Sequence, residues 1–386
     1  MIAYHKTWLN NLRVLAVFKT HLEQQRITVE EFTGISAAYP VGFYTPGIFA
    51  RVGLAILTCV IVLFGDGLLS LMFWVSGAVG PSGWIVFLGL LSYGALELMI
   101  HTKHHFRSGV DDALLFLSAF QVAAGFAIFL YAGDENYLAL SLIIFLVTLF
   151  LTIRFLDTLM AAVCVASFFM LVCFGLEKIG PVGLMVIPFV MIITSALVYF
   201  IVMRVKDDLR LINYQYCFVA AQVVCLLTFY AAGNYYIVQT LSDELHGTAT
   251  PIALGPFFWT WTFLIPALYL GFGIKRKDIV LIRISLLLIA AAALTFRTYY
   301  HILPVDLMLT ISGAIVLGLV YAITKYLKKP KHGFTLDEPN QANLMDNLKI
   351  ESLVVAQTFG HTQTPQNDGA KFGGGEFGGG GASDGF

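Results

Sequence analysis

The chain has 386 residues, of which 58% are hydrophobic and only 12% are charged, and its formal net charge is −1. Soluble proteins carry roughly a quarter charged residues, so this composition, with a mean hydropathy of +0.80, excludes an ordinary soluble globular protein. The net charge gives no global attraction for nucleic acid, and none is expected as a partner. Because the apolar runs have helical length and no alternating strand pattern accompanies them, the predicted fold class is all-α, a polytopic helical integral membrane protein.

Residues 1–46 predict a small cytoplasmic unit, a hairpin of two amphipathic helices. The second helix is expected to begin after Thr28, because Thr28 and Glu31 have the spacing of a capping box. Pro40 and Pro46 then end the unit. A hairpin of this kind is expected to lie against the membrane surface.

Ten apolar runs follow in residues 47–327, the predicted transmembrane domain. At about 1.5 Å per residue, each run is long enough for a helix to cross roughly 30 Å of hydrocarbon. The predicted spans lie near 48–74, 83–101, 111–131, 138–153, 157–176, 182–204, 213–232, 256–274, 278–296 and 304–327. Gly65-Asp66-Gly67 interrupts the first run, so residues 68–76 are predicted either to continue the helix or to form an interfacial or re-entrant piece. The longest outer loop is expected at 233–255.

The basic residues are distributed very unevenly over the loops between these runs. Of 23 Lys and Arg, only Lys178 and Arg297 fall on one set of alternating loops, and the other 21 fall on the opposite set or the termini. The positive-inside rule therefore places both termini in the cytoplasm, which requires an even number of spans. The expected location is a bacterial cytoplasmic (inner) membrane, with the lipid bilayer as the first partner.

Residues 328–386 predict a flexible cytoplasmic tail, which is rich in Gly and Phe from residue 371. Such a composition cannot bury enough apolar surface to fold by itself. The tail, like the hairpin, is a candidate for binding a membrane or cytoplasmic protein partner.

The sharpest local pattern is a carboxylate followed by three histidines at the cytoplasmic end of the second span: Glu97, His101, His104 and His105. Imidazole and carboxylate groups are ligands for transition metals, and residues four apart share one helix face. The H-x-x-H-H spacing also resembles one histidine box of membrane-bound di-iron desaturases and hydroxylases, which need several such boxes. The alternative is a basic cap near lipid headgroups, in which Glu97 pairs with His101 or Lys103. If these residues form such a cap, no cofactor is predicted.

Two further charged pairs are candidate ion pairs or ligand-binding groups. Arg154 and Asp157 lie three residues apart in the turn between the fourth and fifth spans, and this spacing predicts a mutual ion pair. Arg297 lies on the outer side near Asp306. It is predicted to anchor that turn through Asp306 or to hold an anionic headgroup or carboxylate.

The layout of the chain resembles a family of bacterial predicted membrane proteins, the domain of unknown function 2157. The segment QRITVEEFTGISAAYP at 25–40 carries the resemblance, because it leads directly into a first span and a series of short-looped helices. The resemblance extends in layout over roughly residues 20–327. It implies no established activity, catalytic residue or cofactor.

Three functions remain open on the sequence. The first is a non-enzymatic membrane component that binds partner proteins or lipids, and no catalytic residue is predicted. The second is a transporter or permease for a small, weakly polar solute, which requires a midplane cavity lined by Gln121, Gln222 or nearby Thr and Ser residues. The third is a metal-dependent membrane enzyme that uses His101, His104 and His105.

Overall fold

The computed structural model describes residues 2–74, 80–131, 136–246 and 254–300, together with isolated helical positions between 310 and 325. The predicted tenth span at 304–327 is described only at those isolated positions. Asp306 and the predicted tail from residue 328 lie outside the described residues.

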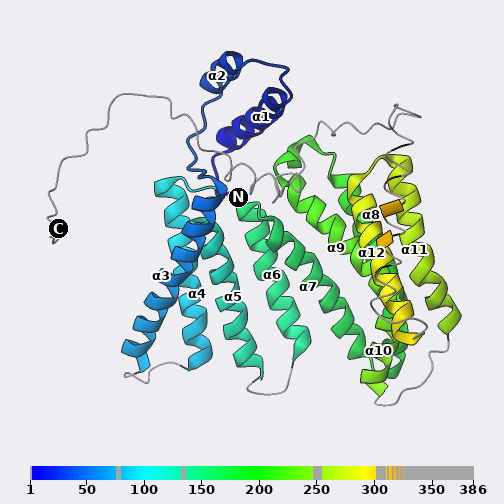
Figure 1. The fold of residues 1–386 in the computed structure, drawn as a ribbon. Helices are drawn as coiled ribbons and strands as arrows, with labels where there is room; N and C mark the ends of the chain where they lie inside the picture. The colour runs from blue at the N-terminus through cyan, green and yellow to red at the C-terminus, as the bar shows by residue number, and fades with distance from the viewer. Residues whose placement is uncertain are drawn as a thin grey trace, which may run out of the picture. The chain divides into compact units, whose positions relative to one another are not determined.

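Within the described residues, nine helices are long and apolar enough to cross a membrane. They run antiparallel to their chain neighbours (Figure 1) and confirm the polytopic helical fold and nine of the ten predicted spans. The nine helices are α3 (Ile48–Trp74), α4 (Pro81–Lys103), α5 (Val110–Tyr131), α6 (Tyr137–Phe155), α7 (Thr158–Glu177), α8 (Pro181–Val205), α9 (Gln215–Gly233), α11 (Gly255–Arg276) and α12 (Ile279–Tyr299).

The first span is one continuous helix. α3 runs through Gly65-Asp66-Gly67 as far as Trp74, so the alternative of an interfacial piece beginning at residue 68 is wrong for residues 68–74. In water such a Gly-Asp-Gly sequence favours a turn. In hydrocarbon every backbone N–H and C=O group needs a partner within the chain, which favours continuation of the helix.

The basic residues gather at one end of the spanning helices, which is here termed the basic side. It comprises the first turns of α3, α5, α7, α9 and α12, the last turns of α4, α6, α8 and α11, and the loops between them. Contacts between distant segments join these ends. Arg51 at the start of α3, for example, pairs with Asp112 at the start of α5, with its Nη2 atom 2.6 Å from the Asp112 Oδ2 atom.

The N-terminal hairpin consists of α1 (Lys6–Glu23) and α2 (Val29–Ala38). The capping box is confirmed: the Glu31 N–H donates to the Thr28 hydroxyl over 3.2 Å, and the Thr28 N–H donates to the Glu31 carboxylate over 2.8 Å. The Thr28 hydroxyl also donates to the Glu31 carboxylate over 3.1 Å, and the two bonds that Thr28 donates stabilise the ionised carboxylate and lower the pKa of Glu31.

The hairpin is fixed to the basic side by hydrogen bonds at several points. The Ala3 N–H donates to the Arg154 carbonyl oxygen over 2.9 Å, and the Arg13 guanidinium donates to the Ile212 carbonyl oxygen over 2.9 Å. Ile212 belongs to the short 3₁₀ helix η1 (Leu209–Tyr214) before α9. The chain leaving the hairpin is held at Tyr44, whose N–H donates to the His104 carbonyl oxygen over 3.1 Å.

The predicted outer loop at 233–255 contains a helix of its own, α10 (Tyr235–His246). Asn234 starts this helix, because its side-chain oxygen accepts from the Ile237 N–H over 3.2 Å. The ring of Tyr235 stacks on Trp259 of α11, with 4.8 Å between the ring centroids, and meets Tyr299 of α12 edge-on at 5.0 Å. This aromatic group lies at the helix ends opposite the basic side, which agrees with the interfacial positions that such residues prefer.

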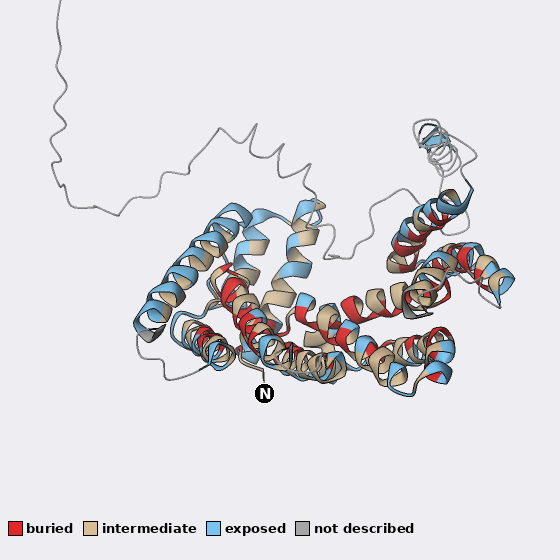
Figure 2. Ribbon diagram, turned by 90° about the horizontal axis from the view of Figure 1, so that it is seen from below, coloured by how far each residue is buried: buried red, intermediate tan, exposed pale blue. Residues whose placement is uncertain are grey.

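Close helix packing depends on small residues in α4 and α5. A Cβ atom at Gly125 would lie 2.6 Å from Val86 Cγ2, and one at Gly89 would lie 2.8 Å from Val122 Cγ2. The two glycines therefore allow the helices to approach closely, as small residues do in membrane bundles. Buried residues face neighbouring helices while outward faces are exposed (Figure 2), as expected for helices that meet lipid on their outer surfaces.

Candidate functional site

Glu97 on α4 is the centre of a hydrogen-bonded ion pair on the basic side. Its carboxylate receives both Nε and Nη2 of Arg154 from α6, the second at 2.9 Å from Oε2. The Tyr93 hydroxyl donates to Glu97 Oε1 over 2.6 Å, and His101 Nε2 lies 3.3 Å from Oε2. Both carboxylate oxygens are therefore engaged by protein groups, and the fork-shaped guanidinium has the geometry of a bidentate pair.

The three predicted histidine ligands have separate surroundings. His101 is exposed beyond Glu97 on the last turn of α4, and His104 ends that helix in a left-handed conformation at φ 51°. The His104 ring meets Trp8 of α1 edge-on at 5.1 Å, while His105 Nδ1 lies 2.7 Å from the Ser108 hydroxyl. Among the described residues, no three His, Cys, Asp or Glu side chains have an arrangement that could hold a metal ion. The four predicted ligands thus have other partners, and a transition-metal site at these residues remains only a prediction.

Arg154 and Asp157 do not have the partners that their spacing predicts. Arg154 binds Glu97, whereas the Asp157 carboxylate accepts from the Met160 N–H over 2.8 Å and caps the start of α7. Leu156 between them has a left-handed backbone conformation at φ 57°, which turns the chain sharply between the two residues. This turn directs each charged side chain to a different helix.

Of the predicted pair Arg297 and Asp306, the structure describes only Arg297. Arg297 lies half-buried in the last turn of α12, and Asp306 lies outside the described residues. Their pairing stays a prediction.

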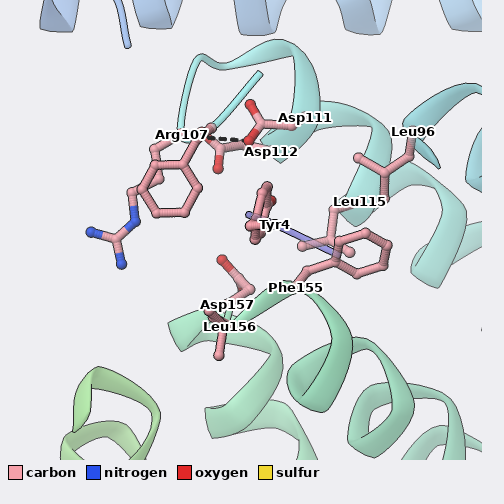
Figure 3. A pocket seen from close by; sticks show the side chains of 10 residues that line it. Tyr4, Leu96, Arg107, Asp111, Asp112, Leu115, Phe155, Leu156 and Asp157 are labelled. Atoms are coloured by element: carbon pink, nitrogen blue, oxygen red, sulfur yellow. Dashed lines mark hydrogen bonds between the residues drawn. The ribbon is translucent and has the colours of Figure 1, made fainter. Parts of the chain in front are cut away.

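A second polar group on the basic side surrounds Tyr4, which precedes α1 (Figure 3). The Tyr4 ring borders a small cavity of about 10 Å³, enough for about one water molecule. Three carboxylates and one guanidinium line it together with apolar side chains: Asp111, Asp112, Asp157 and Arg107. The sequence offered no pattern that singles out Tyr4, because its partners come from three separate helix ends.

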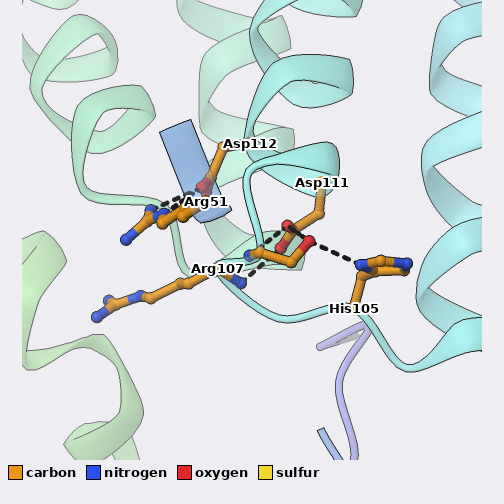
Figure 4. A network of polar contacts seen from close by, with 6 residues as sticks. Arg51, His105, Arg107, Asp111 and Asp112 are labelled. Atoms are coloured by element: carbon orange, nitrogen blue, oxygen red, sulfur yellow. Dashed lines mark hydrogen bonds and ion pairs between the residues drawn. The ribbon is translucent and has the colours of Figure 1, made fainter. Parts of the chain in front are cut away.

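Asp111 holds the loop before α5 in shape (Figure 4). Its carboxylate accepts from the Arg107 N–H over 2.7 Å, and from the N–H and hydroxyl of Ser108 over 2.8 Å each. The Ser108 hydroxyl also contacts His105, so a chain of hydrogen bonds links the partly buried His105 to the buried Asp111 carboxylate. These hydrogen bonds satisfy both carboxylate oxygens of Asp111, so neither oxygen needs a bound ligand.

The carboxyl of Asp157 is the member of this group that gives a testable pH dependence. Burial raises the pKa of Asp157, although the N–H of Met160 opposes the shift. A carboxyl whose pKa is raised by folding stabilises the fold while it is protonated, and this contribution is lost as pH rises from the unfolded pKa through the folded one. We expect Asp157→Asn to flatten the dependence of Tm on pH over that window and to keep Tm at neutral pH at least as high as in the parent.

The matched variant for this prediction is Asp157→Ala, which removes the cap as well as the charge. It is expected to cost about 1 kcal/mol, because an N-cap side chain is lost, whereas Asn is itself a good N-cap. Thermal unfolding in mild detergent at several pH values measures both. If Asp157→Asn and Asp157→Ala lower Tm equally, the buried charge of Asp157 is not the cause of the pH dependence.

An apolar groove with a volume of about 240 Å³ lies between the basic halves of α8 and α11 and the middle of α9. Its floor is buried at Cys225 and Leu226 of α9, and its rim is exposed at Phe200 of α8 and Phe272 of α11. The lining residues are Ser195, Ala196, Tyr199, Phe200, Cys225, Leu226, Phe229, Tyr269, Phe272, Arg276 and Leu281. Hereafter this opening is called the lateral groove.

The amides predicted to line a transport cavity are hydrogen-bonded within the bundle. Gln222 is fully buried, lies 3.4 Å from Lys206 Nζ and donates to the Asp278 carboxylate over 3.3 Å. Gln121 donates to Asp66 of α3 over 2.5 Å. Each amide therefore joins helices within the described bundle.

The fold and these sites define a multi-pass helical membrane protein. Comparison of the chain with protein-family models, with curated proteins and with solved structures finds no match. The resemblance to the domain of unknown function 2157 therefore stays a prediction.

Proposed function

We propose that this protein is a non-enzymatic membrane component that binds a phospholipid of the cytoplasmic leaflet in the lateral groove. One acyl chain lies along the apolar floor, and an anionic headgroup lies at Arg276. The observation that carries the proposal is a groove with apolar walls and a guanidinium at its basic end.

The shape of the groove suits a chain-like apolar ligand that enters from the side. α8 and α11 contact each other near their outer ends, where Phe189 lies 6.0 Å from Phe257 and 6.1 Å from Phe258 between ring centroids. The groove lies on the other half of the same helices, where α9 forms the floor. A ligand there is flanked by helices on both sides and has the exposed rim residues Phe200 and Phe272 at the opening.

Affinity for such a ligand cannot come from the hydrophobic effect alone, since the surrounding lipid tails are equally apolar. The headgroup must supply the difference. Arg276 lies in the last turn of α11 and lines the groove, with Lys275 and Lys277 beside it in the chain. A guanidinium binds phosphate oxygens in a bidentate manner, and each basic residue near a membrane surface contributes about 1 kcal/mol toward anionic lipid.

Native mass spectrometry of the full chain in mild detergent tests the proposal. The probes are phosphatidylglycerol and phosphatidylethanolamine with identical acyl chains, offered together. The parent protein is expected to retain one lipid with about a fivefold preference for phosphatidylglycerol, which corresponds to about 1 kcal/mol. Arg276→Gln is expected to retain lipid but to lose the preference.

A matched pair of tryptophan variants locates the binding. Ala196 lines the groove, whereas its neighbour Leu197 does not and is exposed. Ala196→Trp is expected to abolish lipid retention by filling the groove, and Leu197→Trp to leave it intact. Equal retention by the two variants, or no retained lipid in the parent, would overturn the proposal.

A further inference from the structure

A polar triad links three helices in the apolar part of the bundle, away from the lateral groove. Asp66 of α3 accepts a hydrogen bond of 2.5 Å from the Gln121 amide of α5. The Ser92 hydroxyl of α4 donates to the side-chain oxygen of Gln121 over 3.1 Å. Ser92 and Gln121 are both buried.

The triad lies deep in the spans. Gln121 is nine residues beyond Asp112, which pairs with Arg51 on the basic side, so it lies about 14 Å further along α5. Ser92 is eleven residues from each end of α4. Asp66 lies 18 residues after the start of α3 and 8 before its end, and its bond to Gln121 places its carboxyl group inside the hydrocarbon region.

Asp66 has no ionic partner among the described residues, where the ion pairs join Arg51, His101 and Arg154 to other carboxylates. The other charged groups that α3, α4 and α5 carry are at the basic side: Arg51, Glu97, His101, Lys103, Asp111 and Asp112. The same helices also carry the titratable groups Cys59, Tyr93 and Tyr131, which are uncharged at neutral pH. An ionised carboxylate in hydrocarbon is costly, and one neutral amide donor offsets only part of that cost. A carboxyl at such a position is a functional-site candidate by default.

The residues beside Asp66 support a function at this position. Gly65 and Gly67 flank it inside a continuous helix, where each glycine costs about 1 kcal/mol relative to alanine. Packing does not require them, because a Cβ atom at either position would meet nothing within 4 Å. Asp66 itself is only partly buried, so its carboxyl group is accessible from outside the helix bundle.

We propose that Asp66 is a site of reversible protonation in the membrane interior, with Gln121 and Ser92 holding its carboxyl group. The ligand is a proton, and the site is independent of lipid binding in the lateral groove.

Carbodiimide labelling of the full chain in detergent tests this proposal. A carbodiimide adds the O–H of a protonated carboxylic acid across one C=N bond, and the adduct rearranges to a stable N-acylurea without a leaving group. The apolar reagent dicyclohexylcarbodiimide is expected to label Asp66, as seen by peptide mass spectrometry, and labelling should decrease reversibly as pH is raised. A water-soluble carbodiimide should leave Asp66 unlabelled.

Two controls keep the result interpretable. Asp66→Asn retains an acceptor for Gln121, so it should preserve the elution profile and Tm while the label is lost. Glu97, which is paired with Arg154, is an internal control and should remain unlabelled by the apolar reagent. An unlabelled Asp66 in a folded parent, or labelling by the water-soluble reagent in preference to the apolar one, would refute the proposal.

Discussion

Replacing Tyr4 by alanine is expected to detach the N-terminal segment from the basic side and to cost about 3–5 kcal/mol, the range for truncating a large buried aromatic residue. Tyr4 is only 8% exposed. Its ring meets Phe106 edge-on at 4.8 Å, Phe43 at 6.1 Å and Phe155 at 6.4 Å between centroids. These partners come from the loop before α5, the end of the hairpin unit and the last residue of α6, so one side chain joins three segments.

Hydrogen exchange measures this detachment directly. The amide of Ala3 donates to the Arg154 carbonyl oxygen, and the amide of Phe106 donates to the Tyr44 carbonyl oxygen. Both amides should lose protection in Tyr4→Ala, and Tm should fall. Tyr39→Ala is the matched control, because Tyr39 is 41% exposed at the end of α2. It is expected to change neither quantity.

Replacing Tyr4 by phenylalanine distinguishes the contribution of the packed ring from that of the hydroxyl group. Burial, followed by the nearby Asp111, Asp112 and Asp157, raises the pKa of Tyr4 well above its ordinary value, so the hydroxyl stays neutral at physiological pH. Tyr4→Phe keeps the ring and removes only this neutral group, and it should retain most of the stability lost in Tyr4→Ala. Equal damage from both variants would mean that the hydroxyl, rather than the ring, holds the segment.

The spanning helices could be predicted from sequence because length and hydropathy are local properties. The course of α3 was left open for a physical reason: Gly65-Asp66-Gly67 breaks a helix in water, but the apolar solvent forces the backbone to satisfy its own hydrogen bonds. α10 was missed because its twelve residues are too few to form a span and lie in a polar segment. Its start at Asn234 is a capping signal that could have located it.

The candidate sites were harder to predict because their residues are distant in the chain. Arg154 and Glu97 are 57 residues apart, and no local spacing indicates their pairing. The local spacing of Arg154 and Asp157 was misleading, since the left-handed turn at Leu156 separates them. The lateral groove depends on how α8 and α11 pack against α9, which periodicity along a single helix does not encode.

Removing the guanidinium of Arg154 is expected to be the most damaging change of a charge on the basic side. Arg154→Ala leaves the Glu97 carboxylate, which is 17% exposed, with Tyr93 and His101 as its remaining partners. Breaking a fully buried pair costs about 3–5 kcal/mol, whereas an exposed pair contributes about 0–1 kcal/mol. The Arg154 side chain is 29% exposed, so solvent screening reduces the expected loss to about 2 kcal/mol.

A double-mutant cycle distinguishes the ion pair from a general loss of packing. Glu97→Gln and Arg154→Ala should each lower the free energy of unfolding measured by titration from mild detergent into SDS, and the double variant should lose less than the sum. A coupling of about 1–2 kcal/mol is expected for groups in direct contact. Lys103→Ala, an exposed cation at the end of the same helix, should change stability by less than about 0.5 kcal/mol. If the two losses are simply additive, Glu97 and Arg154 stabilise the bundle independently. The ion pair would then not be the interaction that joins α4 and α6 on the basic side.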